Sequence, residues 1–487
     1  MILTSNEMRQ AEKDSKLSEY ELIQIVGKAL FESMKEDITK KDNILILAGN
    51  GNNGADGIVL STYLNDNGYK CSICFPYLEP NKETAKIIFK EYKYPIIKKE
   101  DISKHLKKAT IVVDSLYGFS FHGTLPQEIQ SLFSVLSSLK CKIYSIDLNS
   151  GAESDTSKYD SYTVRSDITY ALGTYKPFHA LSKEHELCKK IKLVPLPISF
   201  KSNTYKEMNE EIFFKNYPVL KENAYKNTFG KVLLIGGSYS MAGAISFNII
   251  GARSMGASFI EVGLPDSIYP IVSSNYLYPV YHPFNDSNYM DKLTYSIEHA
   301  SCVSFGSGAT YMPHKEAVMN LIIEKANAPI VFDAEALYLL KDNMFILKYA
   351  KKPIIFTPHI GEFSALTHLS IEEINQNKIE LAKDYATKNN VYLILKGANT
   401  IIASPSGELY INNTGNPSLA TAGSGDLLTG MISALLTKQK DIFTALCMSV
   451  FMHGYLADNY ITTHSKIHLD FNEYISLSDS LFYKHGF

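Results

Sequence analysis

The sequence predicts an α/β protein built from two domains with parallel sheets. Short apolar runs alternate with amphipathic helical stretches from residue 43 to residue 172, and a second such series begins at residue 231. Between the two series, residues 194–227 contain prolines and many polar side chains and lack this alternation. The 487 residues are enough for two large domains. We therefore expect one domain over residues 1–212 and another over residues 213–487.

The expected elements follow one another in the order that a parallel sheet requires. In the first domain we expect strands at residues 43–48, 70–77, 110–114, 142–147 and 167–172, and helices at 55–64, 82–92 and 126–139. In the second domain we expect strands at residues 231–235, 258–263, 302–305, 330–333, 354–357 and 391–396, and helices at 244–254, 427–436 and 442–458. Helices alternating with strands predict that both faces of each sheet are covered.

Composition excludes several classes of protein. The net charge is −3, from 48 basic and 51 acidic residues, so nothing drives the whole chain toward nucleic acid or an anionic membrane. Six cysteines are too few for a disulfide scaffold, and Cys71 and Cys74 would point to opposite faces of one strand as reduced thiols. The charged N-terminus has no apolar signal region, and no run of about 18 apolar residues occurs. We expect a cytoplasmic protein without nucleic-acid or membrane partners.

A Gly-rich turn at residues 49–57 (GNGNNGADG) joins the first strand to the first helix. Glycines let the backbone approach a ligand closely, and the new helix presents free N–H groups to an anion. The spacing satisfies G-x-G-x-x-G, but the next strand does not end in the acidic residue of a dinucleotide dehydrogenase. The Asn and Asp oxygens of the turn could instead ligate a hard cation. A plain tight turn remains the alternative.

Two further strands of this half end in polar residues. Asp114 ends one, and Asp147 ends the next and is followed by Ser150. Because ligands of open α/β sheets lie at the carboxyl ends of the strands, we expect these side chains and Asn53 to form a site. Each carboxylate taken alone could simply cap the next helix.

The segments 49–57, 113–123 and 146–151 resemble the successive motifs of the NAD(P)H-hydrate epimerase family, the YjeF N-terminal domain, over about residues 1–200. The resemblance implies a Rossmann-like three-layer sandwich that interconverts the two epimers of hydrated NADH and NADPH. It implies a potassium ion held by Asn53, Asp114 and Ser150. It also implies that the hydrated dinucleotide contacts Asn52, Asn53, Gly54, Ala55, Asp56, Gly118, Phe119, Ser120, Phe121, His122, Gly123, Thr124 and Asp147.

Epimerisation needs proton transfer at the hydrated ring, and Asp147 with a cationic partner would suit that task. His122 stands where the family often has a Lys, and it would be that partner if it were protonated. We therefore expect Asp147 and His122 to be catalytic. The alternative for His122 is an ordinary solvent-exposed loop residue.

A second Gly-rich turn, Gly423-Ser424-Gly425-Asp426, opens the apolar helix expected at residues 427–436. The N–H groups and dipole of that helix would bind phosphate oxygens. Asp426 could take the proton from a hydroxyl group that is being phosphorylated. The alternative is an Asp that only caps the helix. His359 follows another strand end, where a lone His is most often structural.

The second half also contains three further motifs, Gly-Gly-Ser from residue 236, Pro-His-x-Gly-Glu from residue 358 and Lys-Gly-Ala-x-Thr from residue 396. Together with the turn at residues 423–426, they resemble the motifs of the ribokinase-like ADP/ATP-dependent NAD(P)H-hydrate dehydratases over about residues 230–460. The resemblance implies that Asp426 is the base and that Mg²⁺ accompanies ADP or ATP. It implies that Ala244, Gly308, His359 and Asp426 face the hydrated nicotinamide. It implies a nucleotide site made of Lys396, Gly397, Ala398, Asn399, Thr400, Asn416, Thr421, Ala422, Gly423, Ser424 and Gly425.

The order of the two halves resembles the bifunctional NAD(P)H-hydrate repair enzymes, which are both isomerase and lyase and act on NADHX and NADPHX with an adenine nucleotide. We also expect a homo-oligomer. The alternative is a ribokinase-like small-molecule kinase that carries a non-catalytic YjeF-type scaffold domain. The choices between ADP and ATP, and between NADHX and NADPHX, stay open.

Overall fold

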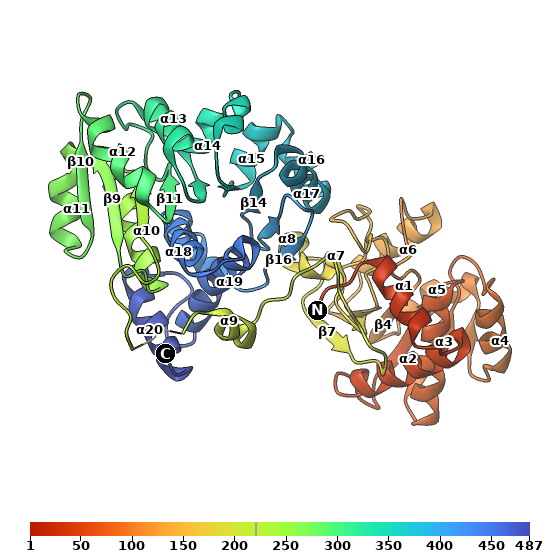
Figure 1. The fold of residues 1–487 in the computed structure, drawn as a ribbon. Helices are drawn as coiled ribbons and strands as arrows, with labels where there is room; N and C mark the ends of the chain where they lie inside the picture. The colour runs from red at the N-terminus through yellow and green to blue at the C-terminus, as the bar shows by residue number, and fades with distance from the viewer. Residues whose placement is uncertain (220–221) are drawn as a thin grey trace. The chain divides into compact units, whose positions relative to one another are not determined.

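The chain forms two compact units in the computed structural model, which describes residues 1–219 and 222–487 (Figure 1). The first unit comprises Met1–Tyr205 and Gln376–Lys378, and the second comprises Lys206–Asn375 and Ile379–Phe487. Our expected boundary at residue 212 falls inside α9 (Glu210–Asn216). Phe213 of this helix is buried in the core of the second unit, so that unit begins before α9.

The first unit contains a seven-stranded sheet in the order β3-β2-β1-β4-β5-β6-β7, and every pair of neighbours is parallel. The strands are β1 (Asn43–Ala48), β2 (Lys70–Cys74), β3 (Ile96–Ile97), β4 (Ile111–Ser115), β5 (Lys142–Ile146), β6 (Ile168–Leu172) and β7 (Ile191–Val194). Apolar side chains of β1 alternate between two clusters, one on each face. Cys71 and Cys74 belong to opposite clusters and are free thiols, as expected.

Helices cover both faces of this sheet, which confirms the predicted three-layer arrangement. Those of the first unit are α1 (Ser5–Asp14), α2 (Glu19–Met34), α3 (Asn52–Asp66), α4 (Glu83–Glu91), α5 (Ile102–Leu106), α6 (Gln127–Ser137), α7 (Pro177–Ala180) and α8 (Ser182–His185). Helices α2 and α3 pack in the cluster on one face, and α5 and α6 pack in the cluster on the other. Capping boxes, Thr4 with Glu7 and Ser18 with Glu21, start α1 and α2.

The second unit contains a nine-stranded sheet in the order β10-β9-β8-β11-β12-β13-β14-β15-β16, antiparallel only in its last two pairings. The strands are β8 (Val232–Ile235), β9 (Ile260–Pro265), β10 (Val280–Phe284), β11 (Cys302–Phe305), β12 (Ile330–Phe332), β13 (Ile354–Phe356), β14 (Tyr392–Leu395), β15 (Ile401–Ala403) and β16 (Leu409–Ile411). Each expected strand of this half is present.

Helices α10 and α18 pack against each other and against β8 and β11 in the core of the second unit. The helices after α9 are α10 (Ala242–Ser254), α11 (Tyr269–Asn275), α12 (Tyr289–His299), α13 (Lys315–Lys325), α14 (Glu335–Leu340), α15 (Ile360–Thr367), α16 (Ile371–Gln376), α17 (Lys378–Asn389), α18 (Ser424–Lys438), α19 (Ile442–Tyr460) and α20 (Tyr474–Lys484).

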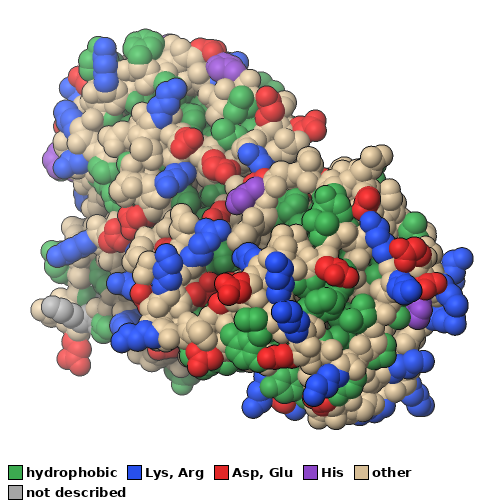
Figure 2. All heavy atoms as spheres, turned by 90° about the vertical axis from the view of Figure 1, so that its right-hand side faces the viewer, with side chains coloured by type: hydrophobic (Ala, Val, Ile, Leu, Met, Phe, Trp, Pro, Cys, Tyr) green, Lys and Arg blue, Asp and Glu red, His purple; other side chains and the backbone are tan. Residues whose placement is uncertain are grey.

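Our sequence-based description lacked several elements, among them α1, α2, β15 and the edge strands β3, β7, β10 and β16. Edge strands are short or carry polar residues, so their local pattern is weak. No helix of the described residues is long and apolar enough to cross a membrane. Figure 2 shows basic, acidic and apolar side chains mixed over one face of the surface, in keeping with the small net charge.

In both sheets the strand order reverses at one point, between β1 and β4 and between β8 and β11. Loops that leave such neighbouring strands turn to opposite faces, which opens a crevice at their carboxyl ends. The topology therefore provides one place for a ligand in each unit.

Candidate active sites

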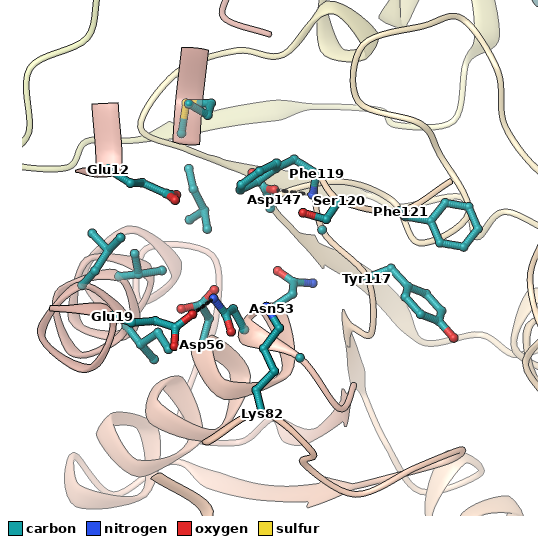
Figure 3. Close-up of a pocket in the computed structure, with 18 of the residues that line it drawn as sticks. Glu12, Glu19, Asn53, Asp56, Lys82, Tyr117, Phe119, Ser120, Phe121 and Asp147 are labelled. Carbon is teal, nitrogen blue, oxygen red and sulfur yellow. Dashed lines mark hydrogen bonds between the residues drawn. The ribbon is translucent and has the colours of Figure 1, made fainter. Parts of the chain in front are cut away.

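The crevice of the first unit holds a cavity of about 430 Å³ (Figure 3). The turn after β1, the loop after β4 and the end of β5 form its walls, together with α1 and α2. Of the residues predicted to contact the dinucleotide, those that line it are Asn52, Asn53, Asp56, Gly118, Phe119, Ser120, Phe121 and Asp147. The structure therefore brings most of the predicted set together.

Two glycines of the first turn, Gly49 and Gly54, are required by close packing of the backbone. A Cβ atom on Gly49 would lie 2.0 Å from the carbonyl oxygen of Leu116, and one on Gly54 would lie 1.9 Å from the carbonyl oxygen of Gly49. Gly54 and Ala55 are buried in α3 and do not line the cavity. Gly49 lets the turn approach the loop after β4, and Gly54 lets α3 pack against Gly49.

Asp147 is held rigidly at the cavity wall. It has a left-handed backbone with φ 65°, which is uncommon outside glycine and is often found at functional sites. Its Oδ1 accepts a 2.6 Å bond from the Lys176 ammonium group, and its Oδ2 accepts a 3.1 Å bond from the Phe119 N–H. His179 donates from Nε2 to the Asp147 carbonyl oxygen over 2.7 Å. Burial lowers the pKa of His179 to about 3, with Lys176 adding to the effect, so the ring is neutral.

Lys176, rather than His122, is the cationic partner of Asp147. Lys176 is fully buried and donates to Asp147 and to the carbonyl oxygens of Leu172 and Thr174. The side chain of His122 is 62% exposed and lies 3.9 Å from Glu153. His122, Gly123 and Thr124 are exposed and do not line the cavity. The β4 loop turns outward after Phe121, which carries these three residues away from Asp147.

Three further carboxyl groups line the cavity, Glu12 from α1, Glu19 from α2 and Asp56 from α3 (Figure 3). Burial raises the pKa of Asp56 well above its usual value, and the charges of Asp147 and Glu12 add to this. Burial and then Asp147 also raise the pKa of Glu12. The site thus combines the Asp147–Lys176 ion pair with two carboxyl groups, those of Glu12 and Asp56, whose pKa values are raised by burial.

The predicted cation ligands Asp114 and Ser150 are in direct contact. The Ser150 hydroxyl group donates to Asp114 Oδ1 over 2.6 Å, and the Ser150 N–H donates to Asp114 Oδ2 over 2.8 Å. Asp114 is fully buried, and its hydrogen-bond donors among the described residues, including Leu116 and Ser145, are uncharged. Buried Nδ2 of Asn53 has no hydrogen-bond partner within the described residues. A buried carboxylate with no cationic partner among the described residues fits a bound monovalent cation, whereas Asn53 Nδ2 is a donor and could not itself ligate one.

The second site lies at the strand ends of the second unit. Buried Asp333, after β12, accepts a 2.8 Å bond from the Lys396 ammonium group after β14. Thr357 and Thr429 donate to the two Asp333 oxygens over 2.7 and 2.9 Å. Burial opposes ionisation of Asp333, but Lys396 and these donors outweigh it and lower its pKa. An ionised Asp333 therefore fixes the Lys396 ammonium group at this edge of the sheet.

Asp426 belongs to the first turn of α18, beside Lys396. A Cβ atom on Gly425 would lie 3.2 Å from Lys396 Nζ, so the helix start and this ammonium group adjoin. The amide of Asn248 donates to the Asp426 carbonyl oxygen over 2.6 Å and ties α18 to α10. Burial raises the pKa of the Asp426 carboxyl group to about 7, and the negative charge of Asp333 adds to the effect. A carboxyl group with that pKa can accept a proton near neutral pH.

The residues predicted to face the nicotinamide also adjoin this edge. A Cβ atom on Gly308 would lie 2.7 Å from the Ala244 Cβ, so these two positions are neighbours. His359 pairs with Lys396 in an isolated parallel bridge at the ends of β13 and β14. The His359 ring accepts bonds from the N–H groups of Gly361 and Glu362 and caps α15. Its ring is 55% exposed and remains accessible to a ligand.

The predicted nucleotide residues fall into two groups. The loop Thr421–Gly425 is exposed or partly exposed at the N-terminus of α18, where first-turn N–H groups lack helical partners. Asn399 is fully buried and donates to the carbonyl oxygen of Asn412, and Asn416 donates to Asp458 over 3.0 Å. Gly397 and Thr400 bond to each other within the loop after β14. The first group can contact phosphates, and the second shapes the loops around them.

A helix N-terminus beside Lys396 and Asp426 at the strand ends of an α/β fold is typical of enzymes that act on phosphorylated ligands. The sequence profile of the family described as NAD(P)H-hydrate dehydratase matches residues 232–476, half of the 487 residues. The chain belongs to the NAD(P)H-hydrate dehydratase family. A second profile, YjeF-related protein N-terminus, matches residues 19–178.

Individual relatives agree with this assignment. The chain is 28% identical over 483 residues to the bifunctional NAD(P)H-hydrate repair enzyme Nnr of Dictyoglomus turgidum, covering 93% of each chain. Among solved structures, the ADP/ATP-dependent NAD(P)H-hydrate dehydratase of Bacillus subtilis, co-crystallised with ATP and Mg²⁺, has a TM-score of 0.51 and 27% identity, over 58% of this chain and 99% of that one. A ribokinase-like superfamily protein of Enterococcus faecalis, at TM-score 0.53 and 23% identity over 58% of this chain and 98% of that one, shares the fold.

Sequence reasoning missed Lys176, Glu12 and Asp333 as site residues. Lys176 and Asp333 each lie just beyond a strand, so the argument applied to Asp114 and Asp147 could have found them. Glu12 lies on an N-terminal helix far from any strand end, and no local pattern distinguishes it.

Proposed function

We propose that this protein repairs hydrated NADH and NADPH in two steps. The first unit interconverts the R and S epimers of the hydrate, and the second unit dehydrates the S epimer at the expense of ADP or ATP with Mg²⁺. The observation that supports this most directly is Asp426, with its pKa near neutrality, beside Lys396 at the start of α18. A separate cavity around Asp147 in the same chain supports the epimerase step.

The residues of the second site suit phosphoryl transfer followed by elimination. The hydrate carries a hydroxyl group on the carbon next to the ring nitrogen, and hydroxide is a poor leaving group. Asp426 takes the hydroxyl proton as the oxygen attacks the terminal phosphorus, and Lys396 with the α18 N–H groups stabilises the phosphate charge. The nitrogen lone pair then expels phosphate, and loss of a ring proton restores the dihydropyridine. Mg²⁺ bound with the nucleotide would neutralise phosphate charge.

Incubation of the protein with a mixed-epimer hydrate and ADP or ATP tests the proposal. We expect the reduced-nicotinamide absorbance band to return, with one phosphate released for each dinucleotide. Running ADP and ATP in parallel identifies the preferred nucleotide. A stable phosphorylated product without return of the band would instead indicate a small-molecule kinase.

Potassium is the cation that we propose for the site at Asn53, Asp114 and Ser150. Exchanging potassium for tetramethylammonium, which is too large for a buried site, is expected to lower the epimerase rate of the wild-type protein. Asp114→Ala should make that rate low and insensitive to potassium, while the dehydratase rate of the same protein stays unchanged. An epimerase rate that is independent of potassium in the wild type would contradict this, as would a crystal structure in potassium chloride with only water between the three side chains.

A further inference from the structure

Glu12 lies in a part of the chain that no motif of the first unit includes. The matched YjeF-related region begins at residue 19, yet α1 precedes it and contributes to the cavity wall. Figure 3 shows Glu12 and Asp147 approaching the same space from different elements. Helix α1, which lies outside the matched region, therefore places the Glu12 carboxyl group at the wall of the cavity that contains Asp147.

The placement of α1 is well defined. The Leu3 N–H donates to the Tyr175 carbonyl oxygen over 3.0 Å, directly before Lys176. The Ser5 N–H donates to Asp155 over 2.8 Å, and the Thr174 hydroxyl group contacts the Met8 sulfur at 3.6 Å. These contacts tie α1 to the segment that carries Lys176, so Glu12 has a fixed position relative to the Asp147–Lys176 pair.

The Glu12 carboxyl group has no hydrogen-bond or ion-pair partner within residues 1–219 and 222–487, although it is only partly exposed. The charged groups around it are Arg9 and Lys13 on α1, Glu19 on α2, Asp56 on α3, Asp147 after β5 and Lys176 after β6. Glu19 differs from Glu12 because it already accepts bonds from Asn52 and Thr84. Glu12 therefore presents to the cavity a carboxyl group that makes no hydrogen bond or ion pair with the described residues.

We propose that Glu12 is a catalytic acid of the epimerase site and acts on the hydroxyl group of the hydrated nicotinamide. This inference rests on the epimerase function proposed above. Two acid–base groups that reach one cavity from different elements suit a reaction that must break a bond on one face of a carbon and re-form it on the other. Asp147 supplies the second group.

The proposed epimerisation needs no reagent other than water. Glu12 gives its proton to the hydroxyl oxygen as the C–O bond breaks, the ring-nitrogen lone pair forms a C=N bond, and water leaves. A water molecule then adds to the opposite face, the C=N electron pair returns to nitrogen, and Asp147 takes the proton of that water. Exchange with solvent returns a proton to Glu12 and removes one from Asp147. Burial keeps Glu12 protonated to a higher pH than an exposed Glu, as this role requires.

The test uses the full-length protein and one purified epimer without nucleotide, so that no dehydration occurs. Appearance of the other epimer is followed by chromatography over a range of pH. We expect Glu12→Gln to lower the epimerase rate at least about a hundredfold and to remove the fall in rate at high pH that the wild type shows as Glu12 ionises. Glu12→Asp should recover part of the rate, and dehydration of the S epimer should be unchanged.

Asp14→Asn is the matched control, since it makes the same change from carboxyl to amide at an exposed position of α1. A Glu12→Gln protein with the wild-type rate and pH profile overturns the inference. So does a loss that Glu12→Asp does not relieve and that comes with earlier melting than Asp14→Asn, because the effect is then structural. If the wild-type protein itself fails to interconvert the epimers, the proposed epimerase function fails, which is a distinguishable result.

Discussion

Asp426→Asn is expected to lower the rate of S-epimer dehydration at least about a hundredfold while leaving nucleotide binding intact. The amide keeps the shape of the side chain at the start of α18 but cannot accept the hydroxyl proton. Lys396 and the α18 N–H groups, which we assign to the phosphates, remain in place. Turnover is measured from the return of the nicotinamide band, and nucleotide binding by calorimetry.

The pH dependence provides a second check of the same assignment. Because a base acts in its ionised form, the wild-type rate should rise with pH through about 7, the value to which burial raises the pKa of Asp426. The residual rate of Asp426→Asn should lack this rise. Asp479→Asn, an exposed Asp on α20, is the matched control and should behave as the wild type. Near-normal turnover by Asp426→Asn would remove Asp426 from its role as base.

Asp147→Ala is expected to stop the repair of a racemic hydrate near its midpoint. The dehydratase should accept only the S epimer, so the R epimer should be repaired only as fast as it converts spontaneously to the S epimer. The wild-type protein should restore the whole sample in one incubation with nucleotide. The time course of the nicotinamide band distinguishes a plateau near half, followed by slow creep, from complete recovery.

The stability of the Asp147 variants must be measured alongside their activity, because Asp147 neutralises the Lys176 ammonium group. Removing Asp147 leaves a fully buried cation without its counter-charge, which costs about 3–5 kcal/mol of stability. Asp147→Asn keeps a hydrogen-bond acceptor for Lys176 and should stall in the same way with a smaller loss of stability. Asp101→Ala changes an exposed carboxylate of the same unit and serves as control. Full restoration by both Asp147 variants at the wild-type rate would show that the first unit does not act as an epimerase.

The parts of the fold and sites that sequence predicted are local. The alternation of apolar runs and helical stretches predicted the paired sheets, because a buried parallel strand needs a short continuous apolar segment. Asp114, Asp147 and Asp426 each adjoin a strand end or a helix start, so the chemistry of the site could be inferred from their immediate neighbours. The Asp114–Ser150 contact follows from two adjacent strands that end at the same edge.

Tertiary structure alone decided which partners meet. By residue type, His122 and Lys176 are both candidate partners of Asp147, but the β4 loop carries His122 into solvent and the turn after β6 buries Lys176. The pKa values of Glu12 and Asp426 depend on burial and on charges from distant elements, which composition and spacing do not contain. Such effects arise because desolvation and Coulomb energies vary with distances that only packing sets. The sequence by itself determined the fold class and the chemical groups at the strand ends, and the packed structure determined their charge states and partners.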